Sequence, residues 1–159
     1  MPLSEWIRAV LAIDPAAPAV YAAAGDRRWG DLSACVSALD DALTRHGFGP
    51  GTEVAVVLRN RPEHFAAAIG LLATGRCLVT VSPLLGDEAL REDVAGLAPV
   101  PVVAAPDDWE RGLDESLAAG TFGLELTKDP RGPVAVRGGV HARAAEPSRS
   151  PGVAVRMLT

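Results

Sequence analysis

A glycine-rich run at residues 47–51, Gly-Phe-Gly-Pro-Gly, is the first feature with a possible chemical role. Glycine-rich loops bind phosphate groups in dinucleotide-binding proteins, where the loop follows a strand and opens a helix. In this chain a helical pattern precedes the glycines and a strand pattern follows them, so the order is reversed. We therefore interpret the run as a helix end and a turn, and His46 as a cation at a helix C-terminus rather than a catalytic base.

Glu63 and His64 could imitate an acid–base pair, because a carboxylate and an imidazole lie next to each other in the sequence. Adjacent residues on a helix do not face each other, however. Asn60, or the backbone beside it, can cap the helix that Pro62 opens, and Glu63 complements the helix dipole in the first turn. We interpret Asn60, Glu63 and His64 as structural.

Acidic residues in one predicted helix could suggest a cation site; they are Asp87, Glu88, Glu92 and Asp93. We interpret them as the solvated charges of that helix. The chain contains no glycine-x-serine-x-glycine elbow, no histidine pair at metal-ligand spacing and no Cys-x-x-Cys motif. The sequence therefore predicts no catalytic, cofactor-binding or metal-binding residue in this chain.

The elements that would position such residues alternate between apolar runs and helical patterns. Apolar strands separated by helices favour an α/β fold with a mostly parallel sheet that helices cover on both faces. Helices are expected at residues 3–11, 30–46, 62–74, 87–97 and 107–119, strands at 52–58, 77–82, 100–105, 122–126, 134–136 and 153–158, and a hairpin at 19–29.

The helix at residues 62–74 is apolar nearly all round and should be covered on two sides. Gly70 would let a neighbouring backbone come close, and Gly75 suits a left-handed C-terminal cap. We expect three regions: an α/β subdomain at residues 1–140, an exposed connection at 141–152 and a terminal strand at 153–159.

Composition excludes several classes of protein. A chain of 159 residues can form one compact domain, and its net charge of -5 gives no reason to expect nucleic acid or an anionic membrane as a partner. No apolar stretch reaches the ~18 residues that a membrane span needs, and the N-terminus lacks a secretory signal. We therefore expect a cytoplasmic protein in which Cys35 and Cys77 are buried thiols.

A series of local signals occurs in a fixed order along the first half of the chain. The series comprises Arg-Trp-Gly-Asp-Leu at 28–32, a helical pattern, His-Gly-Phe-Gly-Pro-Gly at 46–51, a strand at 52–58, Asn-Arg-Pro-Glu at 60–63, an apolar helix ending at Gly75, and a strand ending in Ser82 and Pro83. This order resembles the start of the acyl-adenylate-forming (AMP-binding) ligase superfamily. That superfamily includes acyl-CoA synthetases, luciferases and peptide-synthetase adenylation domains.

The sequence departs from the superfamily pattern at several positions. Arg28 stands where the family has the threonine of a capping box, Thr52 replaces an aspartate, and Ser82 replaces an asparagine. The stretch after Pro83 lacks the tyrosine-proline-x-x-arginine pattern of peptide-synthetase adenylation domains. The resemblance therefore favours an acyl-CoA-synthetase-like parent enzyme.

The resemblance implies an N-terminal fragment that ends before the phosphate-binding loop of its parent. The parent would use ATP, magnesium and coenzyme A to activate a carboxylic acid as an acyl-adenylate, and both functional lysines of the family would lie beyond Thr159. Lys128 matches neither of them. The fragment itself would be inactive, its partners being the remainder of the ligase and a second copy in a homodimer. The alternative is a free-standing, non-catalytic α/β binding or assembly module.

Overall fold

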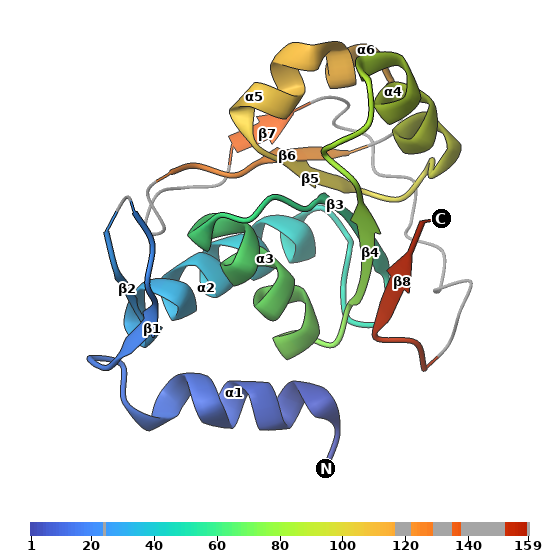
Figure 1. Cartoon of the computed structure of the whole chain (residues 1–159). Helices are drawn as coiled ribbons and strands as arrows, with labels where there is room; N and C mark the ends of the chain where they lie inside the picture. Colours follow the sequence, from blue (N-terminus) through green and yellow to red (C-terminus); the bar gives the residue numbers. More distant parts are fainter. Residues whose placement is uncertain (24, 117–121, 129–134, 138–151, 159) are drawn as a thin grey trace.

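The computed structural model describes residues 1–23, 25–116, 122–128, 135–137 and 152–158, and its elements alternate as expected (Figure 1). The helices are α1 (Leu3–Ile13), α2 (Trp29–Arg45), α3 (Pro62–Ala73), α4 (Asp87–Gly96), α5 (Pro106–Asp108) and α6 (Asp114–Ser116). The strands are β1 (Pro18–Val20), β2 (Arg27–Arg28), β3 (Glu53–Val57), β4 (Cys77–Val81), β5 (Val102–Ala104), β6 (Gly123–Glu125), β7 (Ala135–Arg137) and β8 (Val155–Met157).

The described strands from β3 onwards form one six-stranded sheet in the order β7-β6-β5-β3-β4-β8. Its neighbours are parallel except for β6 and β7, which are antiparallel. β3 pairs with β4 in register from Glu53 and Cys77 to Val57 and Val81. The expected mostly parallel α/β sheet is confirmed, as is the small hairpin, which β1 and β2 form.

Two hydrophobic cores lie on opposite faces of the sheet, because successive strand residues point to opposite sides. Val54 and Val56 pack with residues of α2 and α3, while Ala55 and Val57 pack with residues of α4 and with Trp109. Figure 1 shows the same division, with α2 and α3 on one side of the sheet and α4 to α6 on the other. α1 packs against α2 and α3.

α3 is enclosed, as its apolar composition predicts. It packs on α2 and α1 and contacts β3 and β4. A β-carbon added at Gly70 would lie 3.1 Å from Val36 Cγ2 and 3.3 Å from Val36 Cα, so the expected close approach of a neighbouring backbone is confirmed. Gly75 follows the helix with φ +73°, the left-handed conformation expected at that cap.

The structure differs from expectation in the predicted helix at 107–119. The described part is broken into α5, a π-helical turn at Trp109–Leu113 and α6, since Gly112 adopts φ 88° inside the turn. Residues 117–119 lie outside the described residues. Of the expected connection at 141–152, only Gly152 is described. No helix within the described ranges is long and apolar enough to cross a membrane.

Candidate functional site at the carboxyl edge of the sheet

The carboxyl edge between β3 and β5 is the place where this topology favours a ligand. In open parallel sheets, ligands bind beyond the carboxyl ends of neighbouring strands whose following connections lie on opposite faces. β3 and β5 are such neighbours, since α3 packs on one face and the helical segment after β5 packs on the other. We therefore expect any ligand site at this edge to involve the residues that follow β3 and β5.

An arginine–aspartate pair bridges this crevice. Arg59, two residues after β3, donates from Nε to Asp108 Oδ2 at 2.9 Å and from Nη2 to Asp108 Oδ1 at 2.6 Å. Asp108 lies in the first turn after β5, and its side chain is 0% exposed. Two parallel bonds between a guanidinium and a carboxylate form the strongest arrangement of such a pair. The interaction fixes the loop after β3 to the helix after β5.

A second pair lies beside the first but nearer the solvent. Arg61 donates to both carboxylate oxygens of Asp107 at 3.0 and 2.6 Å, and the Asp107 side chain is 44% exposed. The hydrogen bonds from the Arg61 guanidinium, with its charge, lower the pKa of Asp107 to about 2. Asp107 is therefore ionised at neutral pH and is a poor proton donor or acceptor.

Arg111 connects a third strand end to the same place. Its Nε donates to Asp87 Oδ1 at 2.6 Å and its Nη1 donates to the carbonyl oxygen of Pro83 at 3.1 Å, both in the segment that follows β4. The same Nη1 lies 3.5 Å from Asp108 Oδ1. Asp87 is thus not only a solvated helix charge, as its sequence context predicted, but part of this network.

His64 lies at the inner side of the network and is completely buried. Its Nδ1 accepts a hydrogen bond from the Arg59 backbone N–H at 3.3 Å, while its buried Nε2 has no hydrogen-bond partner among the described residues. Burial lowers the pKa of His64, partly opposed by the charges of Glu63 and Asp108 and assisted by Arg61. The imidazole is therefore held in its neutral form.

The chemistry available at this edge is limited because its charged groups are engaged with one another. Each carboxylate that converges there accepts hydrogen bonds from an arginine. In the described part of the chain, no group of three or more His, Cys, Asp or Glu side chains could hold a metal ion. The ion pairs join the loops that follow these strands, which suits a structural role.

The remaining residues singled out from the sequence lie in structural positions. His46 is the C-terminal cap residue of α2, and its Nδ1 lies 2.8 Å from the Ala42 carbonyl oxygen. Within the glycine-rich run, Gly47 and Gly51 adopt φ values of +86° and +83° in the turn between α2 and β3. The N-cap of α3 is Arg61 rather than Asn60, with no side-chain capping bond.

Both cysteines are buried, as predicted. Cys35 is 5% exposed and Cys77 is 3% exposed. Burial raises the pKa of Cys35 to about 11 and also raises that of Cys77. Because the thiolate is the reactive form, both thiols are unreactive at neutral pH.

Sequence reasoning missed the arginine–aspartate network. The available signal was its position: Arg59 and Arg61 directly follow one predicted strand, and Asp107 and Asp108 directly follow another. Opposite charges at the carboxyl ends of two parallel strands meet when those strands are neighbours. The neighbour relation of β3 and β5 was the missing information.

Comparison with known proteins decides the family. The model of the family described as AMP-binding enzyme matches residues 8–126, which is more than half of the chain. The chain belongs to the AMP-binding enzyme family. The resemblance noted in the sequence is therefore confirmed, and the AMP-binding match includes the whole arginine–aspartate network.

Two curated relatives and one solved structure agree with this assignment to the AMP-binding family. The chain is 30% identical over 84 residues to an acetoacetyl-coenzyme A synthetase from Rhizobium meliloti (strain 1021), covering 53% of this chain and 13% of the relative. It is 27% identical over 122 residues to a malpinin synthetase from Mortierella alpina, covering 71% of this chain and 2% of the relative. The chain therefore spans a small part of the relatives it matches.

The fold itself matches part of a larger CoA ligase. A benzoate CoA ligase from Burkholderia xenovorans LB400 superposes with a TM-score of 0.67, covering 98% of this chain and 32% of that chain at 17% identity. At this identity the likeness shows the shared fold. The mostly parallel sheet flanked by helices is thus the architecture that adenylate-forming ligases also have.

Proposed function

We propose that this chain is the N-terminal part of an ATP-dependent acyl-CoA-synthetase-like ligase that activates a carboxylic acid as an acyl-adenylate. In this proposal the described residues support the active site of the larger enzyme and supply no catalytic group themselves. The observation that carries the proposal is the AMP-binding family match over residues 8–126.

The ion pairs at the carboxyl edge favour a structural role for these residues rather than a catalytic one. Asp108 has no exposed surface and is held by Arg59, while Asp107 is held by Arg61. A general base must be free to take a proton from the substrate, and these carboxylates are acceptors of charge-assisted bonds instead. Their contribution is to fix the loops that follow β3 and β5.

The described residues do not fit the ATP and magnesium that the parent enzyme would use. The glycine-rich turn at 47–51 precedes β3 instead of opening a helix, so its geometry differs from that of a phosphate-binding loop. The acidic groups at the carboxyl edge are paired with arginines. We therefore place the nucleotide, magnesium and coenzyme A sites of the parent outside the described residues.

Carboxylate-dependent ATP–pyrophosphate exchange tests the proposal. The polypeptide translated from the uninterrupted reading frame is compared with residues 1–159, using a panel of fatty, aromatic and amino acids. We expect exchange by the longer polypeptide with at least one acid, none by residues 1–159, and no saturable ATP binding to residues 1–159 in calorimetry. Exchange by residues 1–159 would show that the chain holds catalytic groups, and micromolar, saturable ATP binding would show that it holds the nucleotide site.

Failure of exchange across the whole panel would favour the second candidate, a non-catalytic α/β binding or assembly module.

The position of β8 bears on the partners of the chain under either proposal. β8 forms the edge of the sheet next to β4, as expected for the segment 153–158, and Val155 and Met157 are exposed. An unpaired edge promotes strand addition. We propose that the remainder of the ligase, or a second copy of the isolated chain, covers the β8 edge, and that the protein is cytoplasmic. Sedimentation of residues 1–159 over a concentration series distinguishes a monomer from a dimer.

A further inference from the structure

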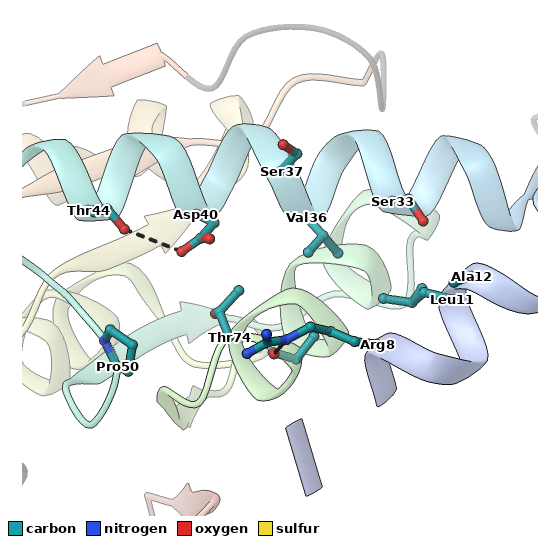
Figure 2. Close-up of a pocket in the computed structure, with 11 residues that line it drawn as sticks. Arg8, Leu11, Ala12, Ser33, Val36, Ser37, Asp40, Thr44, Pro50 and Thr74 are labelled. Atoms are coloured by element: carbon teal, nitrogen blue, oxygen red, sulfur yellow. Dashed lines mark hydrogen bonds between the residues drawn. The ribbon is translucent and has the colours of Figure 1, made fainter. Parts of the chain in front are cut away.

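A cleft of about 460 Å³ lies between α1, α2 and the C-terminal end of α3, well away from the carboxyl edge of the sheet (Figure 2). Aliphatic side chains line part of it, among them Leu11, Val36 and Ala73. Polar side chains of α1, α2 and the end of α3 line the remainder. Ligand sites of small molecules have this size and this combination of an apolar surface with a few convergent polar groups.

One wall of the cleft is a polar stripe on α2. Ser33, Ser37, Asp40 and Thr44 recur at intervals of four, three and four residues, which places them on one face of the helix. Neither serine hydroxyl has a hydrogen-bond partner within the described part of the chain, whereas Thr44 Oγ1 donates to Asp40 Oδ1 at 3.3 Å. The two serine hydroxyls are thus available to a ligand.

Asp40 supplies an acceptor whose charge is already balanced. Its Oδ1 accepts a hydrogen bond from Nη1 of the fully buried Arg76 at 2.6 Å. Its Oδ2 accepts no hydrogen bond from the described residues, and the side chain is 42% exposed. Because Arg76 compensates the carboxylate, Oδ2 can accept a ligand hydroxyl without repelling a nearby anion strongly.

Arg8 supplies the uncompensated charge on the other wall. Its Nε donates to the Ala73 carbonyl oxygen at 2.7 Å, which holds the guanidinium at the end of α3. No carboxylate lies within 4.0 Å of it among the described residues, in contrast to Arg59, Arg61 and Arg76, each of which has an aspartate partner. A guanidinium held in place with free Nη groups is suited to a phosphate or carboxylate.

We propose that this cleft binds a small organic anion that carries several hydroxyl groups. The anionic group binds the Nη atoms of Arg8, the hydroxyl groups bind Asp40 Oδ2 and the hydroxyls of Ser33 and Ser37, and the carbon skeleton lies on the aliphatic surface. This site goes beyond the proposed ligase function, and none of its residues belongs to the carboxyl-edge network.

Calorimetric titration of the full chain tests the site with four related probes: glucose 6-phosphate, gluconate, glucose and inorganic phosphate. We expect saturable binding of one molecule per chain for at least one hydroxylated anion, and weaker binding of uncharged glucose and of inorganic phosphate. The comparison of glucose 6-phosphate with gluconate distinguishes a phosphate from a carboxylate as the preferred anionic group. Binding of none of the probes, or equal binding of glucose, would overturn the proposal.

Arginine variants locate the site. Arg8→Met keeps the aliphatic part of the side chain and removes the anion contact, and we expect it to weaken binding about 10-fold or more. Arg45→Met is the matched control, because Arg45 also donates from Nε to a backbone carbonyl, that of Asp41 at 3.1 Å, but does not line the cleft. Equal weakening by both variants would refute the assignment to this cleft.

Ser37→Ala provides a measurement that does not alter charge. We expect it to reduce the preference for the hydroxylated anion over inorganic phosphate, while binding of inorganic phosphate stays unchanged. Circular dichroism and urea unfolding of each variant establish that it is folded before binding is compared. An unchanged preference in a folded Ser37→Ala variant would contradict the proposed contact with the ligand hydroxyls.

Discussion

Replacement of Asp108 by alanine should destabilise the fold far more than replacement of the adjacent Asp107. Each aspartate accepts two hydrogen bonds from one arginine, and Asp108 Oδ1 has a further, longer contact with Arg111 Nη1 at 3.5 Å. They differ in burial, since the Asp108 side chain is 0% exposed and the Asp107 side chain is 44% exposed. The comparison therefore tests the effect of burial on a bidentate ion pair, together with the longer Arg111 contact of Asp108.

The expected magnitudes follow from that difference. Removing one partner of a buried pair leaves the other charge uncompensated and costs about 3–5 kcal/mol, while an exposed pair contributes roughly 0.2–1 kcal/mol. For a protein of this size, 1 kcal/mol shifts the melting temperature by about 2–4 °C. Asp108→Ala should thus lower the melting temperature by roughly 6–20 °C, and Asp107→Ala by less than about 4 °C.

The free energy of unfolding of both variants is measured by urea unfolding followed by circular dichroism. An unchanged slope of that free energy against urea concentration indicates that the variants unfold in comparable transitions. The double variant Arg59→Met with Asp108→Leu is the control for the mechanism. It removes both charges and should lose less stability than Asp108→Ala alone. Equal losses for Asp107→Ala and Asp108→Ala, within about 0.5 kcal/mol, would refute the argument from burial.

Two further predictions concern the helices. Gly70→Ala should destabilise the protein by about 1–3 kcal/mol despite the better helix propensity of alanine, because the added carbon would lie 3.1 Å from Val36. Gly96→Ala in α4 is the control and should be neutral or stabilising, because nothing lies within 4 Å of the added carbon. A gain in stability from both changes, measured by urea unfolding, would contradict this reasoning. Stability should also fall as the pH drops from about 6.5 through the lowered folded-state pKa of His64, since the unfolded chain then binds the proton more readily. Unfolding free energies at pH 7.5 and 5.5 should differ less in a folded His64→Gln variant; an identical pH dependence would count against the buried neutral imidazole.

Much of the fold could be predicted because local patterns determined it. The stretch at 53–57 is a short apolar run of the length of a buried strand, and the apolar helix at 62–73 has end signals, Pro62 at its start and Gly75 at its cap. The broken helix after β5 was not predicted; Gly112 adopts φ 88° there, and a β-carbon added to it would lie 3.1 Å from Arg91 Nη1. A glycine inside a helical pattern does not reveal by itself that the helix is interrupted.

The carboxyl-edge network could not be predicted, because it depends on which strands are neighbours. β3 is followed in sequence by β4, yet it also pairs with β5, and only this second pairing brings Arg59 to Asp108. The polar stripe that contains Ser37 and Asp40, by contrast, could be assigned to one face of a helix from its spacing alone. The sequence does not show that Arg8 of α1 would lie opposite it.

The place of β8 in the sheet has a consequence for the order of assembly during synthesis. β3, β4 and β5 follow one another closely in the chain, and β3 pairs with both of the others, whereas β8 joins β4 from a distant part of the sequence. Contacts between nearby segments form first, so the central strands can associate while β8 is still being translated. Until then the backbone N–H of Leu78, which later donates to the Ala154 carbonyl oxygen at 2.9 Å, can pair with a strand from another segment or another chain. The nascent chain is thus exposed to mispairing along β4 until β8 has been synthesised.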